Sequence, residues 1–259
     1  MSTYRGYVFD LDGTVYLGEN AIPGAPQVIA ALREQGRGVV FLSNKPLQPL
    51  EVYAQKLTRL GIPTSTDDVI NSTLVLIRYL LGEMPAAKVF AIGETPLLDE
   101  LTAAGLSLSD KPDEIDVVIA SFDRTFDYRK LNIGYQALRL GSHFFATNAD
   151  RTCPVEGGEI PDAAAVIGAL EGCSGRKVEL VAGKPSALIV DVALQRLGLR
   201  AEDCLMVGDR LETDILMGAK AGMSTALVLT GVTQRLDLAH SSVQPDYTLE
   251  SVADISCIY

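Results

Sequence analysis

The sequence is poor in the residues on which several classes of site depend. It has no tryptophan, two histidines and four cysteines among 259 residues. Two histidines leave little on which to build a histidine-based hydrolase. The cysteines lie at positions 153, 173, 204 and 257 and form no CxxC pair, so they match neither a zinc site nor a disulfide framework. Unpaired thiols of this kind are typical of a reducing compartment.

Basic residues and long apolar runs are also scarce. Lys and Arg total 22 against 33 Asp and Glu, which gives a formal net charge of -11. The basic residues are scattered, so we expect no nucleic-acid partner. No secretory apolar region is present, and the longest apolar helix candidate, 74–81, is interrupted by Arg78. We therefore expect a cytoplasmic protein that does not insert into a membrane.

Strand-like and helix-like segments alternate along the chain, which predicts an α/β fold with a parallel sheet. The continuous apolar run at 38–42 is typical of a central parallel strand. The middle of the chain repeats the strand–helix–strand pattern on a smaller scale between polar loops. We therefore predict an inserted α/β domain at 85–178, and a first domain made of 1–84 and 179–259.

Two carboxylates directly follow an apolar strand candidate near the N-terminus. Tyr7-Val8-Phe9 runs into Asp10, Leu11 and Asp12, and a glycine and a threonine follow. If Leu11 is extended, the two aspartates face the same side. Close carboxylates repel each other, and one becomes neutral unless a cation lies between them. The pattern therefore indicates either a proton-sharing pair or a metal site.

Further polar groups follow other strand candidates, as Ser43 and Asn44, Lys184, and Asp209. Ligands of open α/β sheets bind beyond the carboxyl ends of the strands, where these groups would meet. Carboxylates and an ammonium suit Mg²⁺ together with a phosphate. One carboxylate can attack phosphorus, and another can protonate the leaving oxygen and then activate water.

In chain order, these segments resemble the four motifs of the haloacid dehalogenase-like (HAD) superfamily: 10–14, 43–44, 184, and 208–214. The insertion resembles the C2-type cap of subfamily IIA, the NagD-like and p-nitrophenyl phosphatase-like branch; segments 122–124, 147–150 and 183–185 strengthen this placement. The resemblance covers nearly the whole chain. It implies a Rossmann-like core with an inserted C2 cap. It also implies a Mg²⁺-dependent phosphatase that acts on sugar phosphates or similar small monoesters through an aspartyl-phosphate.

The resemblance implies a role for each motif residue. Asp10 would be the nucleophile and Asp12 the general acid/base, and Lys184 would steady both Asp10 and the phosphate. Ser43 and the Asn44 amide would bind the transferring phosphoryl group. Taken alone, Ser43 and Asn44 are also ordinary helix-cap residues.

The implied metal ligands are Asp10, the backbone carbonyl of Asp12, and Asp209, with Asp214 supporting the metal shell. Asp214 also fits a helix N-cap. In the cap, Asp123 and Arg124 would contribute to substrate selection, although a solvated surface pair is the plain alternative.

Two positions depart from the usual pattern of the branch. Lys45 and Arg210 stand where asparagine is common. Both would add positive charge near the site if they point inward, which favours compact acidic or sugar phosphates as substrates. Relatives with C2 caps often dimerise, so a homodimer is an open expectation.

Other functions were weighed against this one. Within the branch, the alternatives are phosphoglycolate, nucleotide and pyridoxal phosphate phosphatases. An aspartyl-phosphate receiver domain would be about half as long and would need no cap. A 2-haloacid dehalogenase needs no Mg²⁺, so Asp12 and Asp209 favour phosphate chemistry. A non-catalytic phosphate-binding protein would have no need of both Asp10 and Asp12.

Overall fold

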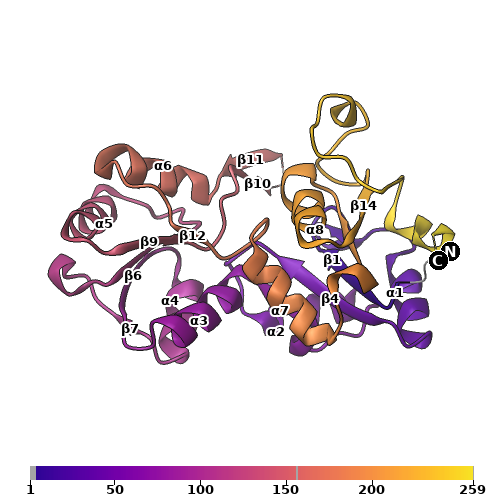
Figure 1. Ribbon diagram of the computed structural model, residues 1–259, viewed down its shortest axis with the longest axis horizontal. Coiled ribbons are helices and arrows are strands. Elements are labelled where there is room, and N and C mark those ends of the chain that lie inside the picture. Colours follow the sequence, from indigo (N-terminus) through magenta and orange to yellow (C-terminus); the bar gives the residue numbers. More distant parts are fainter. Residues whose placement is uncertain (1–3, 156, 259) are drawn as a thin grey trace. The chain divides into compact units, whose positions relative to one another are not determined.

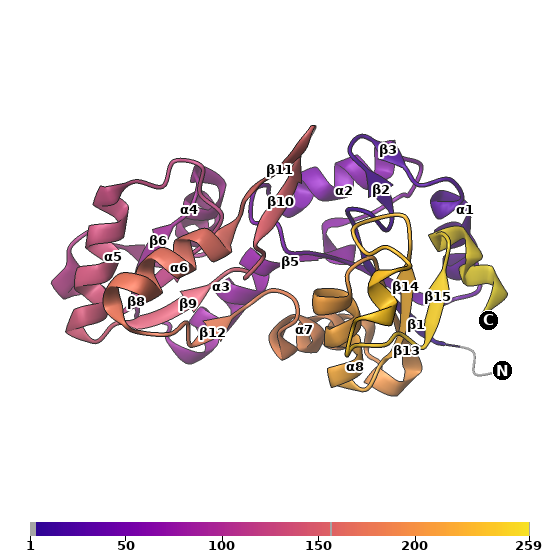
Figure 2. The same ribbon diagram turned by 90° about the horizontal axis from the view of Figure 1, so that it is seen from above.

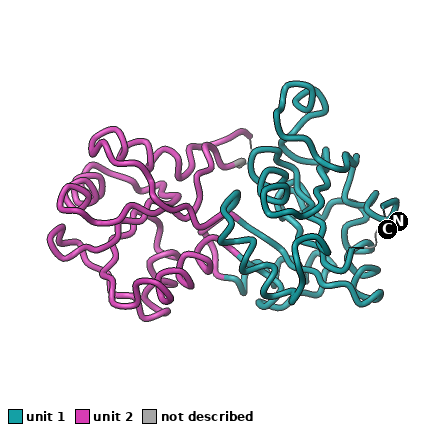
Figure 3. Tube along the Cα trace, in the orientation of Figure 1, with its two compact units in different colours: residues 1–43, 50–70, 184–259 teal, residues 44–49, 71–183 magenta. Residues whose placement is uncertain are grey.

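The computed structural model describes residues 4–155 and 157–258 (Figure 1). The chain forms two compact units (Figure 3). The first unit comprises 1–43, 50–70 and 184–259, and the second comprises 44–49 and 71–183.

The first unit is built on a six-stranded sheet with strand order β15-β14-β13-β1-β4-β5. Its strands are β1 (Gly6–Asp10), β4 (Gly38–Ser43), β5 (Val69–Asn71), β13 (Cys204–Gly208), β14 (Ser224–Val228) and β15 (Tyr247–Leu249). The pairings from β15 through β4 are parallel, and Phe9 on β1 lies opposite Val207 and Phe41 on its two neighbours. The predicted α/β fold with a parallel sheet is confirmed.

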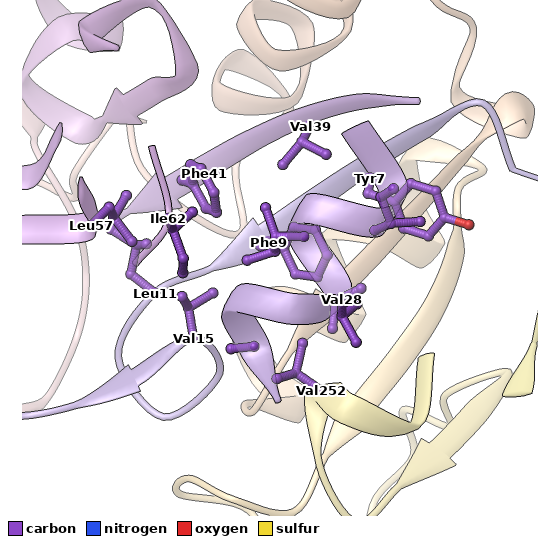
Figure 4. Close-up of a cluster of buried hydrophobic side chains, with 14 of the residues drawn as sticks. Tyr7, Phe9, Leu11, Val15, Val28, Val39, Phe41, Leu57, Ile62 and Val252 are labelled. Carbon is purple, nitrogen blue, oxygen red and sulfur yellow. The ribbon is translucent and has the colours of Figure 1, made fainter. Parts of the chain in front are cut away.

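Both faces of this sheet are covered, which explains why its strands read as continuous apolar runs. Phe9 and Phe41 point into a core with Val28, Leu57 and Val252 (Figure 4). That face is covered by α1 (Ala25–Glu34), α2 (Leu50–Arg59) and the short helix η6 (Val252–Cys257).

The opposite face of the sheet contacts α7 (Ala187–Leu197) and α8 (Leu216–Ala221). Gly218 shows how close this packing is, because a Cβ atom there would lie 2.8 Å from the Cβ of Met206 on β13. A small hairpin of β2 (Tyr16–Leu17) and β3 (Asn20–Ala21) follows β1. The sheet thus carries helices on each side and leaves the carboxyl ends of its strands to the connecting loops.

The second unit has its own five-stranded parallel sheet, with order β12-β9-β8-β6-β7. Its strands are β6 (Lys88–Ile92), β7 (Ser107–Leu108), β8 (Val117–Ala120), β9 (His143–Ala146) and β12 (Leu180–Val181). Its helices are α3 (Ser72–Glu83), α4 (Thr95–Ala103), α5 (Tyr128–Leu140) and α6 (Ala163–Ser174). An antiparallel hairpin, β10 (Thr152–Val155) and β11 (Gly158–Pro161), extends away from this sheet (Figure 2).

The second unit is longer at both ends than the predicted insertion 85–178. Helix α3 belongs to it because Tyr79 packs edge-on against Phe145 of β9, with ring centroids 5.8 Å apart. Segment 178–181, expected to begin the return to the first domain, contributes β12, which pairs with β9. Hairpin β10–β11 and helix α6 were not anticipated.

Two further observations concern the cysteines and the helices. Cys153 and Cys204 are buried, Cys173 and Cys257 are exposed, and all four are free thiols. Across the described ranges, no helix combines the length and apolar character needed to cross a membrane.

Candidate active site

Polar side chains gather in the first unit where three adjacent strands end. Asp10 is the last residue of β1, Ser43 is the last residue of β4, and Asp209 directly follows β13. Strand β1 pairs with both neighbours, so parallel pairing brings these ends to one edge of the sheet. All three residues are buried, with exposed fractions of 7%, 3% and 1%.

Three buried carboxylates form a cluster at this edge. Asp10, Asp209 and Asp214 each offer an oxygen, and these oxygens lie within 4.8 Å of one another. Burial raises the pKa of Asp10 well above its ordinary value, and the charges of Asp214 and Asp209 raise it further, against the opposing effect of Lys184. Such a group of acids must either hold protons or be neutralised by cations.

Lys184 supplies one cation to the cluster. Its Nζ donates hydrogen bonds to Oδ1 of Asp10 and, at 2.7 Å, to Oδ1 of Asp214. Burial lowers the pKa of this lysine, but the two carboxylates raise it by more, so that it lies above its ordinary value. Lys184 is therefore charged, yet one positive charge among three carboxylates leaves the cluster short of positive charge.

Asp214 is not the helix N-cap that was one of the two roles considered for it, because Arg210 is the N-cap of this turn. It lies in a single π-helical turn, Leu211–Ile215, and its Oδ2 accepts a hydrogen bond from the backbone N–H of Arg210 at 3.1 Å. Its Oδ1 meanwhile accepts from Lys184. The same carboxylate thus closes the turn and joins the cluster. Gly208 permits this arrangement, because a Cβ atom there would lie 2.3 Å from Asp214 Cβ.

Asp209 has one satisfied oxygen and one unsatisfied oxygen. Its Oδ2 accepts from the backbone N–H of Val232 at 2.7 Å. Its Oδ1 is buried and finds no hydrogen-bond partner within the described part of the chain. Burial, with the nearby charge of Asp214, raises the pKa of Asp209 to about 6. A buried carboxylate oxygen without a donor is costly unless a proton or a metal ion occupies its lone pair.

Backbone rather than side chains packs around this carboxylate. A Cβ on Gly231 would lie 1.9 Å from Oδ2 of Asp209, and a Cβ on Gly13 would lie 2.6 Å from the same atom. Gly13 also has a φ of +88°, a conformation that favours glycine. The pocket around Asp209 is therefore closed to side chains. The atoms that could bind a metal ion in this pocket are carboxylate oxygens, the ligands that a hard cation such as Mg²⁺ prefers.

Asp12 is placed differently from the sequence-based argument. Strand β1 ends at Asp10, and the carbonyl oxygen of Leu11 accepts hydrogen bonds from Thr14 and Val15 in a tight turn. The argument that required an extended Leu11 therefore does not apply, and Asp12 is not a member of the three-carboxylate cluster. Asp12 is half-buried and forms a bridge with Tyr16, whose pKa is raised by burial and by the Asp12 charge.

The two predicted phosphate-binding residues of the second motif fall on either side of a unit boundary. Ser43 belongs to the first unit, and Asn44 begins a segment of the second. The side-chain amide of Asn44 donates to Asp150 Oδ2 at 3.0 Å. Burial raises the pKa of Asp162, and the nearby charge of Lys45 opposes part of that rise.

Asp123 and Arg124 of the second unit are held by neighbours within that unit. Asp123 Oδ1 accepts from the backbone and hydroxyl of Thr125, and its Oδ2 accepts from Lys130 at 2.6 Å. Arg124 forms a two-pronged ion pair with Glu94, each N–O distance being 2.7 Å. Their assignment to substrate selection stays a prediction.

The loop after β14 was missed by the sequence analysis. Gly231 and Val232 contact Asp209, and the Thr230 hydroxyl donates to the carbonyl oxygen of Gly13 at 2.6 Å. Segment 230–233 could have been recognised from the sequence, because it follows the carboxyl end of a strand candidate, as Asp10, Ser43 and Asp209 do.

Comparisons with known proteins agree with this geometry. A family model described as haloacid dehalogenase-like hydrolase matches residues 7–107, and a HAD-hydrolase-like model matches residues 181–255. The sugar-phosphatase AraL of Bacillus subtilis is 39% identical over 97% of this chain and 92% of its own length.

Solved structures are similar along the whole chain. A p-nitrophenyl phosphatase from Archaeoglobus fulgidus superposes with a TM-score of 0.93 and 33% identity, covering 99% of this chain and 100% of that one. NagD from Escherichia coli K-12 has a TM-score of 0.89 and 30% identity, with 97% and 98% covered. The chain therefore belongs to the HAD superfamily, in its NagD-like branch of subfamily IIA, and it is a phosphatase.

Proposed function

We propose that this phosphatase hydrolyses sugar phosphates or similar small phosphate monoesters, with Mg²⁺ as cofactor and Asp10 as nucleophile. The observation that carries the proposal is the buried cluster of Asp10, Asp209 and Asp214 around Lys184, with Oδ1 of Asp209 unsatisfied within the described residues. A site with this excess of buried negative charge suits a divalent cation. The bound cation would in turn offset the negative charge of a phosphate substrate.

Asp10 would perform the first half of the reaction. Its carboxylate attacks phosphorus, the P–O bond to the ester oxygen breaks, and that oxygen takes a proton from Asp12. Lys184 engages Oδ1 of Asp10, which orients the carboxylate and leaves the attack to Oδ2. The buried ammonium group of Lys184 also stabilises negative charge on the phosphoryl oxygens.

Asp12 would perform the second half. Now ionised, it accepts a proton from water, and the water oxygen attacks phosphorus while the bond from phosphorus to Asp10 breaks. Free phosphate leaves, and both aspartates return to their starting state. The half-buried position of Asp12 in the turn after β1, outside the carboxylate cluster, suits a group that must exchange protons.

Asp10, the carbonyl of Asp12, and Asp209 would hold Mg²⁺, with Asp214 supporting the shell. When bound, the ion supplies positive charge beside the phosphoryl group. Ser43 and the Asn44 amide would bind phosphoryl oxygens, and Asp123 and Arg124 remain candidates for substrate selection. Cytoplasmic location and dimerisation stay predictions of the sequence.

The substrate class is supported by the relative named as a sugar-phosphatase. The test is phosphate release from a panel of sugar phosphates, nucleoside monophosphates, phosphoglycolate and pyridoxal phosphate, with Mg²⁺ and with a chelator. We expect the highest kcat/KM on a sugar phosphate, dependence on Mg²⁺, and no activity in a folded Asp10→Asn variant. Activity that survives in Asp10→Asn would refute the nucleophile, and a preference for nucleotides would refute the substrate class.

A further inference from the structure

Two boundaries between the units fall beside residues of the active site. One lies between Ser43 and Asn44, and another lies between Gly183 and Lys184. The residue after the phosphate-binding serine and the residue before the catalytic lysine therefore both belong to the second unit. Whatever fixes Asn44 and Gly183 also constrains the backbone on which Ser43 and Lys184 stand.

Asn44 is fixed from two directions by residues of the second unit. Its side-chain amide donates to Oδ2 of Asp150 at 3.0 Å, and its carbonyl oxygen accepts from the Ser72 hydroxyl at 2.9 Å. Asn44 is 8% exposed, so water competes little for these bonds. These contacts span 106 and 28 residues of sequence, and they anchor the short segment 44–49 to the body of the unit.

Gly183 is fixed by the same group of residues. Its N–H donates to the carbonyl oxygen of Thr147 at 2.7 Å. The Thr147 hydroxyl donates to Oδ1 of Asn148 at 2.9 Å, and Asn148 in turn donates to Oδ2 of Asp150 at 3.1 Å. A Cβ on Gly183 would lie 2.5 Å from Oδ1 of Asn44, so the two boundary residues are also packed against each other.

Asp150 connects the hydrogen bonds of Asn44 with those that lead through Asn148 and Thr147 to Gly183. One oxygen, Oδ2, accepts from Asn44 and from Asn148. Asn148 is 1% exposed and also donates to Asp162 Oδ1 at 3.1 Å, which ties the group to the start of α6. A carboxylate that accepts from two buried amides makes stronger bonds than a neutral acceptor, so the group should be rigid.

We propose that Asp150 is a positioning residue of the phosphatase. By accepting from Asn44 and Asn148 together, it fixes the backbone that follows Ser43 and the backbone that precedes Lys184. The second unit would then help to set the geometry of the phosphate-binding groups through the two chain connections at 43–44 and 183–184. This inference rests on the proposed function, in which Ser43 and Lys184 bind the phosphoryl group.

The kinetic test compares Asp150→Ala with Asp127→Ala. Asp127 lies in the same unit, caps α5 through one hydrogen bond to the backbone N–H of Lys130, and takes no part in the group around Asp150. With p-nitrophenyl phosphate and Mg²⁺, we expect Asp150→Ala to lower kcat by about 10- to 100-fold, because small misplacements of binding groups are costly. Asp127→Ala should stay within twofold of wild type, and Asp150→Asn, which keeps an acceptor oxygen, should recover most of the activity.

A double-variant cycle shows whether Asp150 acts through Asn44. If it does, the loss in the double variant Asn44→Ala with Asp150→Ala should be smaller than the product of the two single losses, and the remainder should reflect the bond from Asn148. Fully additive losses, or a kcat of Asp150→Ala equal to that of Asp127→Ala, would overturn the proposal.

Hydrogen exchange gives a readout that does not depend on activity. Peptides covering 43–46 and 182–185 should exchange faster in Asp150→Ala than in wild type and Asp127→Ala. Unchanged exchange in both peptides would overturn the positioning role. If wild type hydrolyses no monoester, the proposed function fails, whereas the exchange experiment still decides whether Asp150 holds these segments.

Discussion

Each unit has a buried polar centre, and the two centres are built in opposite ways. In the first unit, three carboxylates share one lysine, and one carboxylate oxygen has no partner within the described residues. In the second unit, the amides of Asn44 and Asn148 alternate with the carboxylates of Asp150 and Asp162, and each of these side chains is hydrogen-bonded. The carboxylates of the first centre repel one another, whereas the carboxylates of the second centre accept hydrogen bonds from amide donors.

Under the proposed function, this difference separates a binding site from a structural one. Neutral amide donors satisfy a carboxylate without help from outside the chain, so the second centre is complete as it stands. Like charges in a buried cluster raise one another's pKa values, and only a proton or a further cation relieves them. The variants below change one centre at a time, so that the contrast can be measured.

Lys184→Met should have the largest effect, because it removes the cation that the structure places in the first centre. We expect kcat/KM to fall by about 10³-fold or more, and the free energy of unfolding of the metal-free protein to fall by about 3–5 kcal/mol. Steady-state kinetics and urea unfolding measure the two effects. Lys177→Met, at an exposed ion pair with Glu171, is the control. A variant with near-wild-type activity would contradict the assigned role.

Gly231→Ala should damage the first centre without altering any charge. The new Cβ would lie 1.9 Å from Oδ2 of Asp209, so the carboxylate must move. We expect kcat/KM to fall by about 10²-fold and half-activation to need more Mg²⁺. Gly168→Ala in α6 is the matched control, since a Cβ there meets nothing within 4 Å. It should stabilise the protein by up to about 1 kcal/mol.

Asp209→Asn should change how the stability of the metal-free protein depends on pH. The pKa of Asp209 is about 6 in the folded protein against an ordinary value of 3.8. The folded state therefore binds this proton more tightly, and wild type should lose stability as pH rises from 3.8 through 6. The loss attributable to Asp209 corresponds to about 3 kcal/mol.

Urea unfolding of Asp209→Asn and wild type in chelator at pH 4 and pH 7 measures this loss. The variant should be the more stable protein at pH 7, and Mg²⁺ should stabilise only wild type. If the free energy of unfolding depended on pH in the same way in both proteins, the raised pKa of Asp209 would be contradicted.

Asp162→Ala should have the smallest effect, because it removes one acceptor of the second centre and leaves the bonds of Asp150 in place. Asp162 caps α6 by accepting from the backbone N–H of Ala163 and also accepts from Asn148. We expect a loss of about 1 kcal/mol in the free energy of unfolding, and Asp162→Asn should keep most of the cap. A loss as large as that of Lys184→Met would remove the contrast between the two centres.

The first centre could be predicted from the sequence because its residues follow a local rule. Asp10, Ser43 and Asp209 each end or follow an apolar strand candidate, and a parallel sheet brings such ends together. Lys184 follows a strand candidate in the same way, and the family resemblance added Asp214. Whether Leu11 is extended could not be decided from the sequence, because apolar patterns do not report where a strand stops within a few residues.

The second centre lay beyond sequence reasoning for a different reason. The bond from Asn44 to Asp150 joins residues 106 positions apart, and no periodicity links them. Segment 147–150 stands out in the sequence only through the family resemblance. The second unit also extends beyond the predicted insertion 85–178, and the contact of Tyr79 in α3 with Phe145 in β9 is one that no local pattern encodes.

The position of the unit boundaries has a practical consequence for chimeric enzymes. An exchange between relatives at 85 and 178 would separate Asn44 from Asp150, and Gly183 from Thr147. Recombination at the boundaries seen here would transfer 44–49 together with 71–183, so that these hydrogen bonds would stay within one donor sequence. Chimeric libraries within this family should therefore treat the six-residue segment 44–49 as part of the second unit.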